Sequence, residues 1–173
     1  MSPGLPNGTG ADPEQFGRAR TPWGTVLVRW RSGSLLASHF EDDGPPAGMA
    51  TPAGGSPDHR RAQAWLDQWL DGDSSLPKGV ALSPVGSDFQ RRVWDLLGSI
   101  PRGRTVSYGW VANALGVPRS VRAVGAACGA NPVALWIPCH RVVASDGALR
   151  GYRWGLHRKA ALLAWESRIA MGG

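Results

Sequence analysis

The segment NPVALWIPCHRVV, residues 131–143, sets a reactive thiol within a run of apolar side chains around which the C-terminal half has to pack. Cys139 is followed directly by His140, and the other cysteine, Cys128, lies eleven positions upstream, which does not fit a Cys-x-x-Cys redox pair. Cysteine reacts as its thiolate, and a neighbouring histidine can lower the free thiol pKa of about 8.5. The segment therefore indicates a nucleophile and its base, buried from water by the apolar side chains on either side of them. Taken alone, the dipeptide would fit a buried structural cysteine better.

Helical patterns separated by tight turns surround this segment. SDFQRRVWDLLGSI, residues 87–100, begins with Ser87 or Asp88 as N-cap and is expected to end before Pro101. A second helix is predicted from Ser107, Gly116 interrupts it, and a third follows Pro118, so the two resemble a helix-turn-helix. Most helix pairs with a glycine between them are simply packed core, so this pattern is weak alone.

The last predicted helix is LHRKAALLAWESR, residues 156–168. Its apolar spacing predicts which side chains face the core, as does the spacing of the helix after Ser87. The inward positions are expected to be Phe89, Val93, Leu96 and Leu97 in the earlier helix, and Leu156, Ala160, Leu163 and Ala164 in the last one.

The N-terminal half has the pattern of a small sheet with one helix. TVLVRW (25–30) and LLASHF (35–40) predict two strands of a hairpin, and KGVALSPVG (78–86) adds a short strand. DHRRAQAWLDQWLDG (58–72) predicts a helix capped by Asp58 and ending near Gly72. Its buried face is expected to hold Ala62, Trp65, Leu66 and Trp69.

The chain is accordingly expected to have an α+β fold in three parts. Residues 1–20, rich in Pro and Gly, are interpreted as a mobile tail, and residues 41–57 as a long loop. Residues 21–86 form a small N-terminal β-sheet domain with a helix, and residues 87–173 a C-terminal, mostly helical domain with a helix-turn-helix.

Composition narrows the class of protein. No apolar run reaches the roughly eighteen residues of a membrane span, and the N-terminus lacks a signal peptide pattern, so a cytoplasmic protein is expected. Two cysteines are too few for a disulfide framework or a thiolate-rich zinc site, so no metal and no cofactor are expected.

Charge is divided unevenly between the two halves. Residues 1–86 carry seven Lys and Arg against nine Asp and Glu, a balance of −2, whereas residues 87–173 carry twelve against four, a balance of +8. A basic half beside a nearly neutral one indicates a polyanionic partner such as nucleic acid, although arginine enrichment from genomic composition explains the charge equally well.

Five sequence motifs in the C-terminal half occur in an order and spacing typical of one protein family. FQRRVW, IPRGRTVSYG, RAVGAACGANP, IPCHRVV and GYRWGLHRKAALLAWE resemble, in order and spacing, the methylated-DNA–protein-cysteine methyltransferases, the O6-alkylguanine-DNA alkyltransferase family. The resemblance covers about residues 87–166, and PCHRV is its most specific part. Residues 21–86 match only in pattern, as the variable N-terminal domain of that family.

The resemblance implies a repair reaction in which the protein itself takes up the alkyl group once. Cys139 would accept it from O6 of a guanine in double-stranded DNA, with O4-alkylthymine as a further substrate. His140 would act as base through a water, Glu166 would orient it, and Asn131 would link the helix-turn-helix to the active-site loop unless it is an ordinary left-handed helix cap. Substrate contacts would come from the side chain of Tyr152, the N–H of Arg153 and the carbonyl of Val142.

The same resemblance implies entry from the minor groove and extrusion of the target nucleotide. Arg122 would fill the vacated stack, Tyr108 would crowd the target phosphate, and the small side chains of Ala123, Ala126 and Ala127 would let the helix approach the DNA backbone. The protein is expected to be a monomer in solution and to assemble cooperatively on DNA.

Two departures from the family bear on substrate size. Trp154 stands where some relatives carry Gly and is expected to narrow the pocket mouth, and Ala134 replaces a bulkier residue or Pro. Large O6 adducts such as benzyl are therefore expected to react slowly.

Three other classes of protein fit these residues less well. A non-enzymatic alkylguanine-binding recruiter commonly carries Trp in place of the nucleophile, but this chain keeps Cys139. A Cys-His hydrolase would leave the basic helix-turn-helix unexplained, and a plain DNA-binding regulator predicts no covalent change in the protein.

Overall fold

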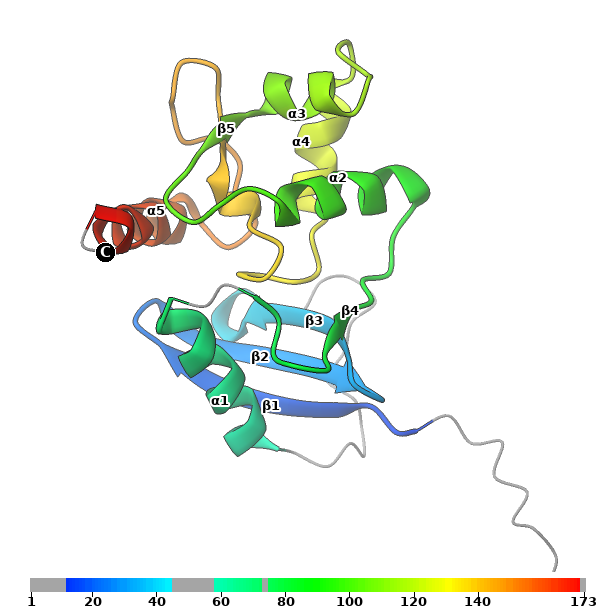
Figure 1. Ribbon diagram of the computed structural model, residues 1–173, viewed down its shortest axis with the longest axis vertical. Coiled ribbons are helices and arrows are strands. Elements are labelled where there is room, and N and C mark those ends of the chain that lie inside the picture. The colour runs from blue at the N-terminus through cyan, green and yellow to red at the C-terminus, as the bar shows by residue number, and fades with distance from the viewer. Residues whose placement is uncertain (1–11, 45–57, 73–74, 172–173) are drawn as a thin grey trace, which may run out of the picture.

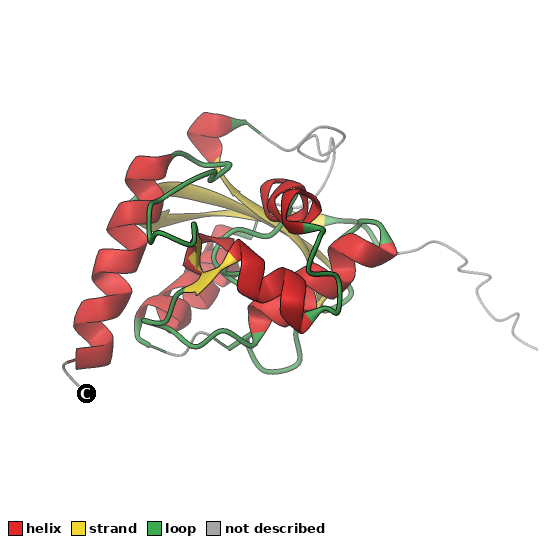
Figure 2. Ribbon diagram, turned by 90° about the horizontal axis from the view of Figure 1, so that it is seen from above, coloured by secondary structure: helices red, strands yellow, loops and turns green. Residues whose placement is uncertain are grey.

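The computed structural model describes residues 12–44, 58–72 and 75–171, and it has the expected α+β architecture (Figure 1). The four strands are ordered β1-β2-β3-β4, antiparallel except for the parallel pair of β3 with β4. Helix α1 (His59–Leu70) covers one face of the sheet, and the helices of the C-terminal half lie beyond the β3 edge of the sheet (Figures 1 and 2). The strands are β1 (Gln15–Thr21), β2 (Gly24–Arg31), β3 (Ser34–Phe40) and β4 (Ala81–Leu82).

The predicted hairpin of β2 and β3 is confirmed. Its turn uses Ser32 and Gly33, at φ 48° and 75°, the left-handed geometry that a two-residue hairpin turn requires. Arg31 pairs directly with Ser34 across this turn, and a register shift follows at Arg29 and Trp30.

The expectation that residues 1–20 form a mobile tail is wrong for residues 15–20. This stretch is most of β1, and it pairs with β2 from Gln15 to Thr21. The inward positions of β1 hold Gly17 and Ala19, which are small because α1 packs closely on them, so the strand lacks the bulky apolar signal. Residues 1–11 lie outside the described part of the chain.

Helix α1 begins as predicted. The side chain of Asp58 accepts a hydrogen bond from Arg61 N, and the helix buries Ala62, Leu66 and Trp69, whereas Trp65 is half-buried. The predicted loop 41–57 starts with a short 3₁₀ turn, η1 (Glu41–Asp43), and its residues 45–57 are outside the described ranges.

The C-terminal half contains the predicted helices. Helix α2 (Asp88–Gly98) starts with a full capping box between Ser87 and Gln90 and buries Val93, Trp94 and Leu97. Phe89 and Leu96, which were expected to be inside, are only half-buried, and Trp94 takes their place with its indole N–H donating to Ala127 O at 2.8 Å.

The expected helix-turn-helix geometry is present as α3 (Tyr108–Ala114) and α4 (Val121–Gly129), joined by a turn with Gly116 at φ 74°. Strand β5 (Val106–Ser107) pairs in parallel with β6 (Val142–Val143). This pairing holds the start of α3 beside the end of residues 131–143, called here the reactive segment. The reactive segment itself contains the 3₁₀ turn η2 (Cys139–Arg141).

The predicted inward face of the last helix, α5 (Leu156–Met171), is wrong. Its buried residues are Arg158, Lys159, Leu162 and Glu166, whereas Leu156 is 46% exposed. Three of the four are charged, so apolar spacing alone predicts the wrong inward face for this helix. Ala160 and Ala164 are exposed, and Leu163 is half-buried.

The N-terminal sheet is joined to the reactive segment through main-chain hydrogen bonds. Ser38 N donates to Pro132 O at 3.0 Å, Ala134 N donates to Ser38 O at 2.8 Å, and Ser38 Oγ donates to Ala134 O at 2.7 Å. A second contact holds the guanidinium of Arg102 against the rings of Trp69 and Trp165, at 4.6 and 4.7 Å. The two halves therefore share one hydrophobic core.

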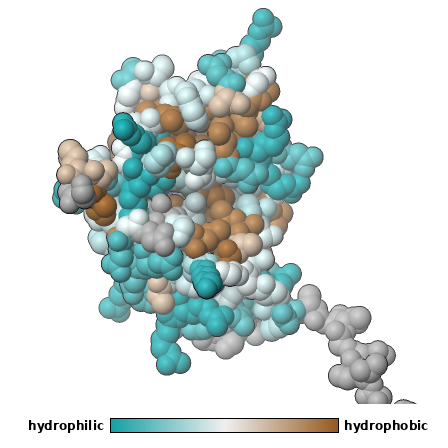
Figure 3. Space-filling model, viewed as in Figure 1, coloured by the Kyte–Doolittle hydropathy of each residue, from teal (hydrophilic) through white to brown (hydrophobic). Residues whose placement is uncertain are grey.

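On the face seen in Figure 3 the surface is largely polar, with apolar groups gathered across its middle and upper part. Among residues 12–44, 58–72 and 75–171, no helix has the length and apolar character needed to cross a bilayer.

Gly17 is the position at which the contact of sheet and helix is closest. A Cβ there would lie 2.4 Å from Asp58 O and 2.6 Å from Ala62 Cβ. We expect Gly17→Ala to lower the free energy of unfolding by about 1–3 kcal/mol, because backbone atoms must move. Gly98→Ala is the matched control, since nothing lies within 4 Å of its Cβ position. Urea denaturation of both variants checks this, and equal stabilities would contradict it.

Candidate active site

Cys139 is enclosed at the start of η2. Its side chain is 3% exposed, and its sulfur accepts a hydrogen bond from Asn131 Nδ2 at 3.2 Å. Burial raises the pKa of the Cys139 thiol to about 11, against the opposing effects of the Asn131 amide and the positive charge of Lys159. The expectation that a neighbouring histidine lowers this pKa is therefore wrong for the free protein, which holds a protonated thiol at neutral pH.

Asn131 fixes both ends of the loop before the nucleophile. Its Nδ2 also donates to Ile137 O at 2.8 Å, and its Oδ1 accepts from Val133 N at 2.8 Å. The left-handed cap considered for Asn131 is wrong, because Leu135 is the residue of this loop with positive φ, at 72°. The amide thus spans the loop from within, and the turn at Leu135 stores local backbone strain.

His140 and Glu166 meet in the interior, as the resemblance implied. His140 Nε2 lies 2.9 Å from Glu166 Oε1, and both side chains are completely buried. A carboxylate only accepts, so Nε2 carries the ring proton and Nδ1 holds a lone pair. Nδ1 has no hydrogen-bond partner among the described residues. Burial lowers the pKa of His140 despite the opposing effect of Glu166, so the ring is a neutral base.

Arg141 holds the carboxylate in place. Its Nε and Nη2 donate to Glu166 at 3.0 and 2.8 Å, and its Nη1 donates to Ile100 O at 2.5 Å. Burial alone would raise the pKa of Glu166, but the hydrogen bonds from His140 and Arg141 lower it to about 2. Arg141 was not among the predicted site residues. Two signals could have suggested it: it follows His140 directly, and an arginine within an apolar segment needs an acidic partner when it is buried.

Lys159 is a second site residue that the sequence analysis missed. Its ammonium donates to Val142 O at 2.6 Å, to Arg150 O at 2.9 Å and more weakly to Gly151 O at 3.4 Å. Its charge lowers the pKa of Cys139, while burial lowers the pKa of Lys159 itself. Lys159 precedes Glu166 by seven residues and so lies on the same face of α5, which is the signal that could have identified it.

The remaining predicted substrate residues surround this centre. Tyr152 is half-buried with its ring edge-on to His140, at 6.4 Å between centroids. The Val142 carbonyl already accepts from Lys159, and Arg153 is exposed with its guanidinium near Gly129 O. The hydroxyl of Tyr108 donates within the protein, to Arg150 O at 2.8 Å, and thereby holds the loop that carries Tyr152.

The structure contradicts the expectation that Trp154 narrows an open pocket mouth. Trp154 is completely buried, with its ring against Phe40 and Tyr152, at centroid distances of 6.4 and 5.3 Å. Ala134 is also completely buried, and its N–H is bonded to Ser38. Both residues lie at the junction with the sheet, because the chain turns inward there instead of lining the surface.

Helix α4 exposes most of the residues expected to face DNA. Arg122, Ala123 and Ala126 are exposed, but Ala127 is 2% exposed and packs in the core, where its carbonyl accepts from Trp94. The assignment of Ala127 to the DNA surface is therefore wrong, because Ala127 lies with Val124 and Cys128 on the face of α4 that packs into the core.

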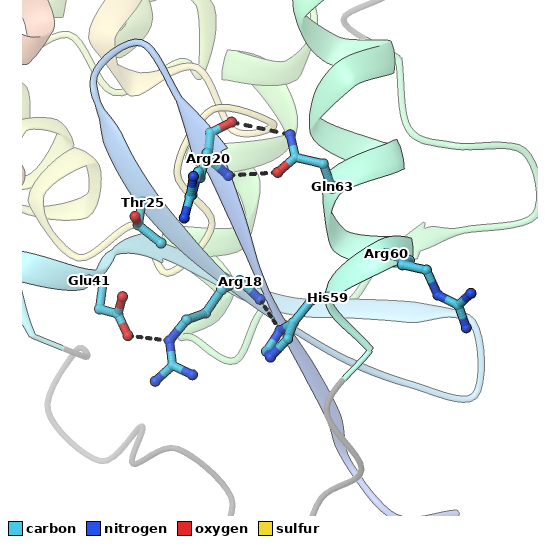
Figure 4. Close-up of a pocket in the computed structure, with 7 residues that line it drawn as sticks. All are labelled: Arg18, Arg20, Thr25, Glu41, His59, Arg60 and Gln63. Atoms are coloured by element: carbon cyan, nitrogen blue, oxygen red, sulfur yellow. Dashed lines mark hydrogen bonds and ion pairs between the residues drawn. The ribbon is translucent and has the colours of Figure 1, made fainter.

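An open pocket of about 460 Å³ lies elsewhere, between β1 and the start of α1 (Figure 4). Arg18 is paired with Glu41 there, and Arg60 points away from the other lining residues. Across the described residues, no group of three or more His, Cys, Asp or Glu side chains is arranged to hold a metal ion.

Comparison with known proteins agrees with this geometry. Residues 88–168 match the family model described as 6-O-methylguanine DNA methyltransferase, DNA binding domain. The chain is 37% identical to the methylated-DNA–protein-cysteine methyltransferase of Salmonella typhimurium, over 91% of this chain and 88% of that protein. It is 55% identical to the bifunctional transcriptional activator/DNA repair enzyme Ada of Escherichia coli over 53% of this chain, but spans only 26% of Ada.

A solved structure is similar over nearly the whole fold. The crystal structure of Mycobacterium tuberculosis OGT in complex with DNA superposes with a TM-score of 0.75 at 34% identity, over 89% of this chain and 93% of that chain. The similarity includes the N-terminal sheet as well as the helical half. The chain therefore belongs to the family of methylated-DNA–protein-cysteine methyltransferases.

Proposed function

We propose that this protein repairs DNA by direct reversal, transferring an alkyl group from O6 of guanine in duplex DNA to its own Cys139. The observation that carries the proposal is the buried array in which Asn131 binds the Cys139 sulfur, while the neutral His140 keeps Nδ1 unbonded and is fixed by Glu166. A binding protein that only recruits other factors would need neither a thiol nor a base at this point.

The proton is the first requirement of the transfer. A thiol with a pKa of about 11 must lose its proton as the substrate binds, and His140 Nδ1 accepts it by way of a bridging water. The imidazolium that results is stabilised by the Glu166 carboxylate, which stays ionised because its pKa is about 2. Arg141 keeps the carboxylate aligned during this step.

The bond exchange follows from the thiolate. The sulfur attacks the alkyl carbon, the S–C bond forms, and the C–O6 bond breaks with its electron pair passing to the guanine. Tyr152 donates a hydrogen bond to the leaving base, the N–H of Arg153 donates to its O6, and the carbonyl of Val142 accepts its exocyclic amine. The product is a thioether, which His140 has no means of hydrolysing, so each molecule acts once.

The proposed encounter with DNA uses the basic helical half. Helix α4 approaches through the minor groove, Arg122 occupies the space of the extruded nucleotide, and Ala123 and Ala126 allow close contact with the DNA backbone. Tyr108 crowds the target phosphate. We propose a monomer that assembles cooperatively on DNA and works in the cytoplasm, where its two free thiols stay reduced. O4-alkylthymine is the proposed secondary substrate.

Intact mass spectrometry tests the proposal directly. After incubation with excess duplex DNA containing O6-methylguanine, we expect the protein to gain about 14 Da, one CH₂, located on Cys139 and added once. Cys139→Ser should gain nothing, although it keeps Cys128. Repeated turnover by one molecule, or a gain on Cys128, would rule the mechanism out.

The reactivity of the resting thiol should depend on pH as a pKa of about 11 requires. Alkylation of Cys139 by iodoacetamide in the free protein should be slow at pH 7 and rise about tenfold per pH unit up to pH 10, because only the thiolate reacts. Peptide mapping separates this from Cys128, whose pKa burial raises to about 12. A plateau of the Cys139 rate below pH 9 would show that the free protein already holds a thiolate.

Arg122 should matter only when a base has to leave a stack. We expect Arg122→Ala to slow repair of duplex DNA about tenfold or more while leaving the reaction with free O6-methylguanine unchanged, since extrusion costs a few kcal/mol. Arg168→Ala, an exposed arginine near the end of α5, is the matched control and should affect neither rate. Equal losses on both substrates would assign Arg122 another role.

A further inference from the structure

A row of aromatic rings runs from the N-terminal sheet to the catalytic base. Phe40, at the end of β3, lies edge-on to Trp154, Trp154 lies edge-on to Tyr152, and Tyr152 lies edge-on to His140. The centroid distances are 6.4, 5.3 and 6.4 Å, within the range of favourable edge-to-face pairs. Only Tyr152 and His140 of these four belong to the proposed reaction.

The outer end of this row is fixed by Arg158. Its guanidinium lies 4.5 Å from the centroid of Phe40, and it donates to Trp154 O at 3.1 Å and to Trp23 O at 3.0 Å. It is also paired with Asp42. One buried arginine therefore clamps the sheet residue and the backbone of Trp154 together.

The segment that carries Tyr152 has little regular structure of its own. It lies between Gly151 and Gly155, both at positive φ, outside any strand or helix. The carbonyls of Arg150 and Gly151 are held by Tyr108 and Lys159, which fixes its beginning. After Tyr152, the segment is held in place by the buried side chain of Trp154, because Arg153 between them is exposed.

We propose that Trp154 is a positioning residue that transmits the placement of the N-terminal sheet to Tyr152. This inference rests on the proposed function, because Tyr152 is assigned there as the donor to the leaving guanine. Misplacing such a donor by about 1 Å can slow a reaction about a hundredfold, so a ring that fixes its orientation controls the rate without contacting substrate. The N-terminal sheet is thereby part of the active site's support.

The competing explanation is that Trp154 only fills the core. Its indole Nε1 has no acceptor among the described residues, so Trp154→Phe removes no hydrogen bond and keeps an aromatic face toward Tyr152. Trp154→Leu removes the ring. Trp30→Leu is the control for loss of a core indole, because Trp30 is buried and edge-on to Trp65, at 5.1 Å, but lies on β2 outside the aromatic row. It also removes the hydrogen bond from Trp30 Nε1 to Gln15 Oε1, so its cost in stability is expected to be at least as large.

The experiment measures the second-order rate of methyl transfer from duplex DNA, DNA affinity and thermal stability for each variant, at a temperature where all are folded. We expect Trp154→Leu to slow transfer about tenfold or more with unchanged DNA affinity, Trp154→Phe to recover most of the rate, and Trp30→Leu to lose stability alone. Tyr152→Phe should slow transfer about a hundredfold, and adding Trp154→Leu to it should cost little more, because both act through one group.

Each outcome decides between the explanations. A Trp154→Leu rate equal to wild type, or additive losses in the double variant, overturns the inference. If Trp154→Leu does not fold, Phe40→Leu removes the row from its far end and must slow transfer while Trp30→Leu does not. Failure of the wild-type protein to gain the methyl mass would instead refute the proposed function.

Discussion

The buried carboxylate of Glu166 is the constraint on which the other parts of the site depend. Burying an ionised carboxylate away from water costs much free energy. Here the cost is offset by hydrogen bonds that Glu166 accepts from Arg141, from His140 Nε2 and from the N–H of Gly103, the last at 3.3 Å. Arg141 in turn donates to Ile100 O in the loop after α2. The Glu166 carboxylate therefore links α5, the η2 turn and the loop after α2. The hydrogen bond that it accepts from His140 Nε2 also orients the His140 ring.

The N-terminal sheet supports this centre from the opposite side. Ser38 extends the hydrogen bonding of β3 to the loop before Cys139, and Arg158 clamps Phe40 and Trp154 together. Catalytic groups lose most of their value when they shift by about 1 Å, so a reactive loop with a strained turn at Leu135 needs a rigid backing. The active-site loop is thus supported by a hydrophobic core that both halves of the chain share.

The electrostatics suit a nucleophile that is used once. Burial keeps Cys139 protonated and His140 neutral in the free protein, while Glu166 stays ionised. A permanently exposed thiolate would react with any electrophile, and an alkylated protein cannot be reset. Keeping the proton on sulfur until the substrate excludes water limits that loss.

The sequence by itself determined the α+β class, the hairpin and the caps at Asp58 and Ser87, because these depend on local spacing and turn chemistry. Only the tertiary structure decided the edge strand β1, the charged inner face of α5, and the parts that Arg141, Lys159 and Trp154 play. Small residues under a closely packed helix leave no apolar signal at β1. Charged residues point inward on α5 because their partners come from distant segments: Val142 O for Lys159, and the Arg141 guanidinium and His140 ring at the η2 turn for Glu166. No local pattern records a partner that folding brings close.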